Sequence, residues 1–341
     1  MFRRNKNIFL IFIFLCCTYP VLAQESFRVL FWNIENLFDT KDDPNKNDNE
    51  FLPNATRHWN DFRYWHKLRN IAKGIIASGN DYVPDLVGLC EVENDSCLYD
   101  LTRRSPLREA DYRYVITDSP DQRGIDVALL YQRGSFKLLQ QQSIRIPNKH
   151  LRKGPTRDIL HVVGEVVSGN LLDVFICHMP SRSGGQAQSE PYRLLTAKVL
   201  KQAVDSVMEI RPYPHILIMG DFNDYPTNKS IKKILCSEKR LQNLMKDKKD
   251  GTYRYRGEWG ILDQFIVSES LLKKKGSIRT SPKNVQILRH DFLLEEDEKH
   301  GGDKPFRTYN GMKYLGGFSD HLPISLDLEI LIRDDKDYYL K

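Results

Sequence analysis

The stretch FRVLFWNI, residues 27–34, is apolar at nearly every position. A strand with one face in water alternates between apolar and polar side chains, whereas a strand covered on both faces does not. FRVLFWNI therefore predicts a strand with a packed layer on each side. This expectation decides the fold class, because a sheet of such strands needs a second sheet or a layer of helices against each face.

Further runs of this kind follow along the chain, together with segments whose apolar residues recur at helical spacing. Helices are expected over 65–79, ended by Gly79, over 189–210, with Ser189 as N-cap, and over 228–247. Strands mixed with a few helices predict an α/β (α+β) fold of two packed mixed β-sheets flanked by helices. The strand-like runs are 84–94 (PDLVGLCEVEN), 126–132 (DVALLYQ), 159–167 (ILHVVGEVV), 171–179 (LLDVFICHM), 215–224 (HILIMGDFND), 261–268 (ILDQFIVS) and 321–331 (HLPISLDLEIL).

The first 23 residues differ from the rest of the chain. A basic segment, MFRRNKN, precedes the continuous apolar run IFLIFIFLCCTYPV and the small residue Ala23. This layout predicts a cleavable secretory signal peptide over residues 1–23, and hence a secreted or periplasmic protein. A permanent N-terminal anchor is the alternative, since the run is nearly long enough to span a bilayer. Neither a linker nor a repeat divides residues 24–341, so a single domain is expected, with an irregular excursion over 273–317.

Charge and cysteine content set only weak limits on function. The formal net charge of +6 falls to +3 without the leader, which carries three basic residues and no acidic one. This permits a polyanionic substrate without requiring one. None of the four remaining cysteines forms a CxxC pair, so a zinc site is not expected. Cys90 and Cys97 are the one close pair that a disulfide could join, while Cys90 and Cys177 end apolar runs, as buried thiols do.

Polar residues of a chemically useful kind stand where the strand-like runs end. We expect these side chains to line one cleft, because the ends of neighbouring strands meet at one edge of a sheet. They are Asn33, Glu91, His178, Asp221 with Asn223, and Asp263, joined by Asp320 and His321 just before the last run.

The chemistry of these residues points to phosphate. Oxygens of Asn, Asp and Glu are hard ligands that suit Mg²⁺, and two histidines can handle protons near neutral pH. Arg157 in PTRDIL and Arg182 in HMPSRSGG are candidates for bidentate phosphate binding. The GxSxG pattern of a serine nucleophile is absent from the sequence. Together these features indicate attack of water on phosphorus, assisted by a metal ion.

Six motifs along the chain resemble the ordered motifs of the endonuclease/exonuclease/phosphatase superfamily, which includes deoxyribonuclease-I-like nucleases. The resemblance spans residues 27–330 and implies a four-layer sandwich, two β-sheets with helices outside, in agreement with the strand pattern. WNIENLFD and PSRSGG are most similar to the secreted bacterial branch often labelled extracellular nuclease. The motifs are FWNIENLFD (31–39), LVGLCEVEN (86–94), HMPSRSGG (178–185), GDFNDYP (220–226), ILDQFIVS (261–268) and GGFSDHLPI (316–324).

Matched position by position, the resemblance implies a role for each site residue. Asn33, Glu91 and Asp320 would bind a divalent metal, Mg²⁺ with Mn²⁺ or Ca²⁺ as alternatives. Asp221 would orient or deprotonate the attacking water. Asn223 would help to hold the phosphate.

Two histidines complete the implied site. His321 would contact the scissile phosphate, its ring fixed by Asp263, and this pairing raises the charged fraction of the imidazole. His178 would assist the leaving oxygen from the other side of the phosphorus. Two nearby acids are alternatives that we disfavour: Glu93 comes after the apolar run has ended, and Asp224 is a good turn former before a proline.

The implied site favours a metal-dependent phosphodiesterase, with DNA or RNA as the favoured substrate and partner. A phosphatase or phospholipase C acting on a phosphorylated small molecule or a lipid headgroup would use the same catalytic centre, since surrounding loops set the substrate. An inactive binding module is disfavoured because every position that the mechanism needs holds a competent residue. No obligate protein partner is implied, and a monomer is expected.

Overall fold

The computed structural model describes residues 23–147 and 154–332. The expected signal peptide, residues 1–23, lies outside this part of the chain except for Ala23. Within the described ranges, no helix combines the length and the hydropathy needed to cross a membrane.

Sheet A contains FRVLFWNI at its centre, as part of β1. Its strands follow the order β13-β19-β1-β2-β4-β3, with β14 also paired to β19. β1 runs parallel to β2 and antiparallel to β19. The strands of sheet A are β1 (Ala23–Leu37), β2 (Leu86–Val92), β3 (Arg113–Ile116), β4 (Asp126–Tyr131), β13 (Ile278–Arg279), β14 (Val285–Ile287) and β19 (Ile324–Ile332).

Sheet B has the order β5-β6-β7-β8-β12-β9. β7 runs parallel to β8, and β8 runs antiparallel to β12. Its strands are β5 (Phe136–Ile144), β6 (Ile159–Val166), β7 (Leu171–His178), β8 (His215–Asp221), β9 (Leu241–Asn243) and β12 (Asp263–Ser268). Three two-stranded ribbons stand apart from both sheets: β10 (Tyr253–Tyr255) with β11 (Glu258–Gly260), β15 (Leu294–Glu296) with β16 (Asp303–Pro305), and β17 (Tyr309–Asn310) with β18 (Lys313–Tyr314).

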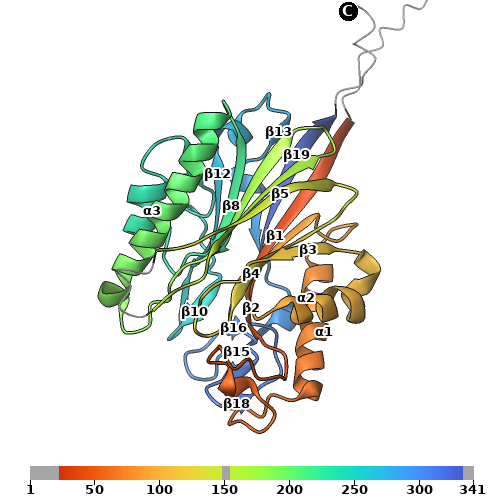
Figure 1. Ribbon diagram of the computed structural model, residues 1–341, viewed down its shortest axis with the longest axis vertical. Helices are drawn as coiled ribbons and strands as arrows, with labels where there is room; N and C mark the ends of the chain where they lie inside the picture. Colours follow the sequence, from red (N-terminus) through yellow and green to blue (C-terminus); the bar gives the residue numbers. More distant parts are fainter. Residues whose placement is uncertain (1–22, 148–153, 333–341) are drawn as a thin grey trace, which may run out of the picture.

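Helices cover the outer faces of the two sheets, α1 and α2 on one side and α3 on the other (Figure 1). The α-helices are α1 (Asp61–Ala77), α2 (Asp95–Tyr99) and α3 (Gln186–Ile210). Single helical turns lie at Asn49–Phe51, Asp100–Arg104, Pro106–Ala110, Ser230–Leu235, Glu269–Leu272, Pro282–Asn284 and Asp291–Leu293.

Three apolar clusters separate the layers. The first joins the inner faces of both sheets, with Phe31 and Leu326 from sheet A against Met219 and Phe265 from sheet B. The second packs the outer face of sheet A against α1, and the third packs the outer face of sheet B against α3. The expected four-layer sandwich is therefore confirmed, and FRVLFWNI is apolar at nearly every position because it contributes to two of these clusters.

Some local expectations were wrong. α3 begins at Gln186 after Gly185, so Ser189 lies inside the helix, where its hydroxyl donates to the carbonyl of Gly185. Most of 228–247 is not helical, because only Ser230–Leu235 forms a helical turn and Leu241–Asn243 joins sheet B as its edge strand. Cys90, Cys97 and Cys177 are buried free thiols.

Candidate active site

The strand register of sheet B places three of the predicted site residues side by side. His178 at the end of β7 pairs with Asp221 at the end of β8, and Asp221 pairs with Asp263 at the start of β12. Both sheets contribute to one cavity of about 620 Å³. The predicted residues that line it are Asn33, Glu91, His178, Arg182, Asp221, Asn223, Asp320 and His321.

Irregular backbone turns two of these side chains into the cavity. Glu91 has a φ of 65° at a register shift between β2 and β4, and Asn223 has a φ of 49° just after β8. A non-glycine residue in this left-handed region costs about 1–3 kcal/mol, and such strain concentrates at functional sites. The shift at Glu91 breaks the strand alternation that would keep Glu93 on the same face. Glu93 instead accepts the backbone N–H of Asp39 at 2.6 Å.

Asp221 is the centre of the site. Its Oδ2 lies 3.1 Å from Nδ2 of Asn33, 3.6 Å from Nε2 of His178 and 3.8 Å from Nε2 of His321. Its Oδ1 accepts the backbone N–H of Asn223 at 2.8 Å. Burial raises the pKa of this carboxyl to about 7, against the opposing charge of His321. A carboxylate that titrates near neutral pH is suited to accept a proton from water.

His178 is buried and neutral. Burial lowers the pKa of its imidazole well below the usual value, and the charges of Arg157 and Arg123 lower it further. Its Nε2 faces Asp221 and lies 3.8 Å from Oε1 of Glu91, whereas Nδ1 has no hydrogen-bond partner among the residues described. A neutral ring facing two carboxylates carries its proton on Nε2, so His178 is a hydrogen-bond donor into the cavity.

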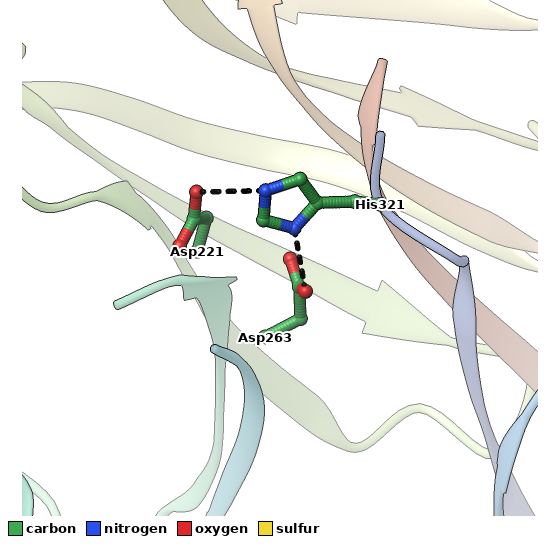
Figure 2. A group of neighbouring side chains, drawn as sticks. All are labelled: Asp221, Asp263 and His321. Carbon is green, nitrogen blue, oxygen red and sulfur yellow. Dashed lines mark hydrogen bonds and ion pairs between the residues drawn. The ribbon is translucent and has the colours of Figure 1, made fainter. Parts of the chain in front are cut away.

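Asp263 and His321 form a buried carboxylate–imidazole pair, which Figure 2 shows beside Asp221. Nδ1 of His321 lies 2.8 Å from Oδ2 of Asp263, and Nε2 is turned toward Asp221. Burial lowers the pKa of His321, but the charges of Asp263 and Asp221 outweigh burial and hold this pKa well above its usual value. The ring is therefore charged at neutral pH and presents an N–H to the cavity.

One short segment holds both members of this pair in place. Thr252 is fully buried, and its Oγ1 accepts the backbone N–H of Asp263 at 3.3 Å. The carbonyl of Thr252 accepts the backbone N–H of Leu322 at 2.7 Å. The next residue, Tyr253, forms a β-bridge with His321 and lies with its ring centroid 4.9 Å from the imidazole. Residues 252–253 thus tie together two motifs that are distant in sequence.

The charge on His321 predicts how the substitution Asp263→Asn changes the pH dependence of catalysis. Without the negative charge of Asp263, less opposes the effect of burial, so the pKa of His321 falls. We expect the alkaline limb of kcat to move about 1–3 pH units lower, with little loss at acidic pH. A pH–rate profile of both proteins measures the change, and an alkaline limb that stays in place would contradict the charged state of His321.

Thermal unfolding across pH provides a second measurement. The folded wild type holds the His321 proton more tightly than the unfolded chain does, so the charge stabilises the fold fully below a pH of about 6.5. This contribution is lost as the pH rises through the folded pKa, which lies well above the usual value. In Asp263→Asn the loss of stability with rising pH shifts to lower pH.

The oxygens that fit a divalent cation come from Glu91 and Asp320. Oε2 of Glu91 accepts the backbone N–H of Asn36 at 2.9 Å, while Oε1 has long contacts with the amide of Asn33 at 3.4 Å and with Nε2 of His178 at 3.8 Å. Asp320 pairs through one oxygen with Arg307 at 3.1 Å. Both side chains line the cavity, and carboxylate oxygens are the hard ligands that Mg²⁺ prefers.

The orientation of Asn33 differs from the expectation that it binds the metal. Its Oδ1 accepts the backbone N–H of Glu35 at 3.0 Å, and its Nδ2 donates to Asp221. Nδ2 also lies 3.4 Å from Glu91, so in this orientation the amide bridges two carboxylates.

Asp221, Asp263 and His321 also lie close enough together to hold a metal, with their ligand atoms within 4.8 Å of one another. A cation at this group would displace the proton that His321 otherwise holds. The structure therefore offers two places for a divalent cation: this buried group, and the carboxylates of Glu91 and Asp320 that line the cavity.

The two arginines predicted to bind phosphate are held by protein groups. Arg157 is buried outside the cavity, where its guanidinium donates to the carbonyls of His178 and Met179 and pairs with Asp121 at 3.1 Å. This position corrects the expectation, because Arg157 fixes the end of β7 instead of facing a substrate. Arg182 does line the cavity, but it donates to the carbonyl of Asn223 at 2.7 Å and to neighbouring side chains.

The sequence carries little signal for several other residues around the site. Arg123 lines the cavity, 2.7 Å from Oδ1 of Asn36 and 3.7 Å from Oε2 of Glu91, but stands in a loop without any periodic pattern. Tyrosines on one wall of the cavity are likewise spread over turns and short strands. They are Tyr225, Tyr253 and Tyr255.

A layer of charged side chains next to Asp320 could also not be predicted from the sequence. Nζ of Lys67 donates to Thr308 at 2.5 Å, and burial lowers the pKa of Lys67 to about 8. Burial raises the pKa of Glu35, which accepts the backbone N–H of Thr308 at 2.6 Å. Arg307 lies between Glu35 and Asp320, 3.4 and 3.1 Å from them. This layer fixes the position of Asp320.

Comparisons with known proteins agree with the fold. A family model described as "Endonuclease/Exonuclease/phosphatase family" matches residues 28–330. A search of curated protein sequences finds no match.

Solved structures show the same architecture at low sequence identity. A Bacteroides thetaiotaomicron protein of the endonuclease/exonuclease/phosphatase family has a TM-score of 0.61 at 15% identity, covering 90% of this chain and 99% of its own. The mannosyl-6-phosphatase of the same organism has a TM-score of 0.58 at 15% identity, covering 89% and 99%. D. rerio TDP2 in complex with a single-strand DNA product has a TM-score of 0.55 at 16% identity, covering 89% and 98%.

Proposed function

The chain belongs to the endonuclease/exonuclease/phosphatase family, and from this premise we propose that it is a divalent-metal-dependent phosphodiesterase that cleaves nucleic acid. The observation that carries the proposal is the set of groups around Asp221. A carboxyl with a pKa of about 7 faces one charged and one neutral imidazole. Hydrolysis of a phosphodiester by water needs a base, a cation for the developing charge and a donor for the leaving oxygen.

Each protein group has a distinct part in this reaction. Asp221, held by Asn33 and Asn223, orients the attacking water and accepts its proton. His321 donates from Nε2 to a non-bridging phosphate oxygen, where negative charge grows in the transition state. His178 donates from its own Nε2 to the leaving oxygen. A divalent cation held by Glu91 and Asp320 would polarise the phosphate and stabilise the leaving oxyanion.

Nucleic acid is the substrate that we favour. TDP2, which shares the fold, has been solved with a single-strand DNA product. WNIENLFD and PSRSGG resemble the secreted bacterial nucleases, and residues 1–23 have the layout of a signal peptide. Cleavage after residue 23 would release a single domain, 24–341, outside the cytoplasm. The protein would then hydrolyse DNA or RNA in the periplasm or the medium.

A phosphatase or phospholipase of related mechanism is the second candidate. One observation favours it: apart from the histidines, the cationic side chains that line the cavity are Arg123 and Arg182 in the described part of the chain, and Arg182 is largely engaged by protein groups. A long polyanion usually meets more basic residues than this. The structurally similar mannosyl-6-phosphatase supports the same alternative.

A substrate panel tests the proposal. The purified protein is offered plasmid DNA, single-stranded RNA, bis-p-nitrophenyl phosphate, mannose 6-phosphate, an inositol phosphate and sphingomyelin, each with Mg²⁺ and with EDTA. We expect kcat/KM for nucleic acid to exceed that for every monoester and lipid by at least about tenfold, or about 1.4 kcal/mol in the barrier. Preference for a monoester or for sphingomyelin would replace the proposal with the second candidate.

A further inference from the structure

The hairpin formed by β10 and β11 is built as a rigid wall of the cavity. Tyr253 pairs with Gly260 and Tyr255 pairs with Glu258, which leaves Arg256 and Gly257 as a two-residue turn. Both turn residues have positive φ, 51° and 85°, as the tightest hairpin turns require. An arginine in this conformation is uncommon, because asparagine or glycine is preferred there.

The two faces of the hairpin differ in chemistry. Side chains alternate between the faces of a β-ribbon, so cross-strand partners share a face. One face carries the two pairs that line the cavity: Tyr253 with Gly260 and Tyr255 with Glu258. The opposite face carries Arg254, whose guanidinium donates to the carbonyls of residues 257 and 301 and so anchors the ribbon. The cavity therefore meets two aromatic rings and one carboxylate.

A third aromatic ring joins this wall from the loop after β8. A Cβ on Gly260 would lie 2.5 Å from the ring of Tyr225, so glycine allows that ring to lie directly against the hairpin. The guanidinium of Arg182 stacks on Tyr225, 4.3 Å from the ring centroid. Tyr225 and Tyr255 are 39% and 59% exposed. The guanidinium of Arg256 lies 5.2 Å from the ring centroid of Tyr255, so each of the two rings has an arginine over one side and a ligand would stack on the other.

We propose that this wall is a nucleoside subsite, in which Tyr225 and Tyr255 stack against the base of the nucleotide whose phosphate is hydrolysed. The inference rests on the proposed function and adds the part of the substrate that the enzyme recognises. Tyr253 already packs against His321 at 4.9 Å, so the wall begins next to the phosphate position. A base attached through its sugar to that phosphate lies against the tyrosines.

The carboxylate of Glu258 favours a nucleobase over a phosphate as the group bound at this wall. Glu258 is exposed and faces the cavity, so a second phosphate of a polyanion would be repelled there. A carboxylate instead accepts hydrogen bonds from the amino groups of a base. Stacking of a base on an aromatic side chain strengthens binding about 5- to 150-fold and tolerates every base. The wall thus suits a base better than a further phosphate of the backbone.

Two ligands that differ only in the base test this subsite. Adenosine 5′-monophosphate and ribose 5-phosphate share the sugar and the phosphate. Calorimetric titration with Mg²⁺ uses the full protein carrying Asp221→Asn, which slows any turnover. We expect adenosine 5′-monophosphate to bind at least about tenfold more tightly. Adding Tyr255→Ala, or Tyr225→Ala, should weaken its binding about tenfold and leave ribose 5-phosphate within about twofold.

Tyr82→Ala is the matched control, because Tyr82 is 87% exposed and lies outside the cavity lining. Equal affinities for both ligands, or equal losses for both in Tyr255→Ala, would overturn the subsite. If mannose 6-phosphate binds more tightly than adenosine 5′-monophosphate, and this binding depends on Tyr255, the wall binds a sugar ring and not a base. Hydrolysis of methyl p-nitrophenyl phosphate, a diester without a nucleoside, is measured separately on the wild type. Its absence contradicts the phosphodiesterase while base-dependent binding still stands.

Discussion

Exchanging Asp221 for asparagine is expected to lower kcat by about 10²–10⁴-fold. Asparagine fits the same space but cannot accept the proton of the attacking water. The variant is also expected to stay folded. Burial raises the pKa of Asp221 to about 7, so its charge is costly in the folded state, and a neutral amide removes that cost. Steady-state kinetics on bis-p-nitrophenyl phosphate and thermal unfolding measure the two effects.

The combination of lost activity and retained stability distinguishes a catalytic role from a structural one. Asp42→Asn is the matched control, since Asp42 is exposed and does not line the cavity. It should leave both kcat and the unfolding temperature unchanged. Full activity in Asp221→Asn would refute the role assigned to Asp221, and a large drop in unfolding temperature would show that its charge supports the fold.

Removal of divalent cations is expected to abolish turnover, and Mg²⁺ is expected to restore it. A readout independent of activity is the unfolding temperature. A ligand that binds only the folded protein stabilises it by about 2.7 kcal/mol at 100 times its Kd. Mg²⁺ should therefore raise the unfolding temperature of the chelated protein. Glu91→Gln should remove most of this increase, because it takes away a charged oxygen that faces the cavity.

Glu93→Gln is the control for the metal experiment. Glu93 lies two residues further along the chain, and burial raises the pKa of its carboxyl to about 8, so it carries little charge at neutral pH. The Mg²⁺-dependent increase should persist in this variant. An increase that survives Glu91→Gln and disappears in Glu93→Gln would move the cation to the other acid.

The layer structure was predictable from the sequence because burial on two faces leaves a direct trace. FRVLFWNI shows no regular alternation of apolar and polar residues, and neither does the run that ends in Asp221. The convergence of strand ends followed from the same runs. Helix boundaries were harder to predict. Ser189 is a good N-cap by type, yet the helix begins after Gly185, four residues earlier in the PSRSGGQAQ segment, which has a positive φ.

Residues whose role depends on tertiary contacts were not predictable. Arg157 has the side chain that phosphate binding needs, but only the structure shows its guanidinium taken up by the carbonyls at the end of β7. Asn33 was expected at the metal because its type is right, whereas the orientation of its amide depends on the backbone of Glu35. Neither set of contacts can be predicted from the local pattern of apolar and polar residues. The tyrosine wall depends on a hairpin of two three-residue strands, which is too short for a pattern.

The segment that positions Asp263 and His321 also leads directly into the hairpin. Thr252 bonds to the backbone beside both catalytic side chains, and Tyr253 is the first residue of β10. A ligand that packs against the tyrosines therefore also acts on the backbone that positions the imidazole of His321. Discrimination among substrates should then appear in the rate of the chemical step as well as in affinity, and poorly fitting esters would be held without being cut.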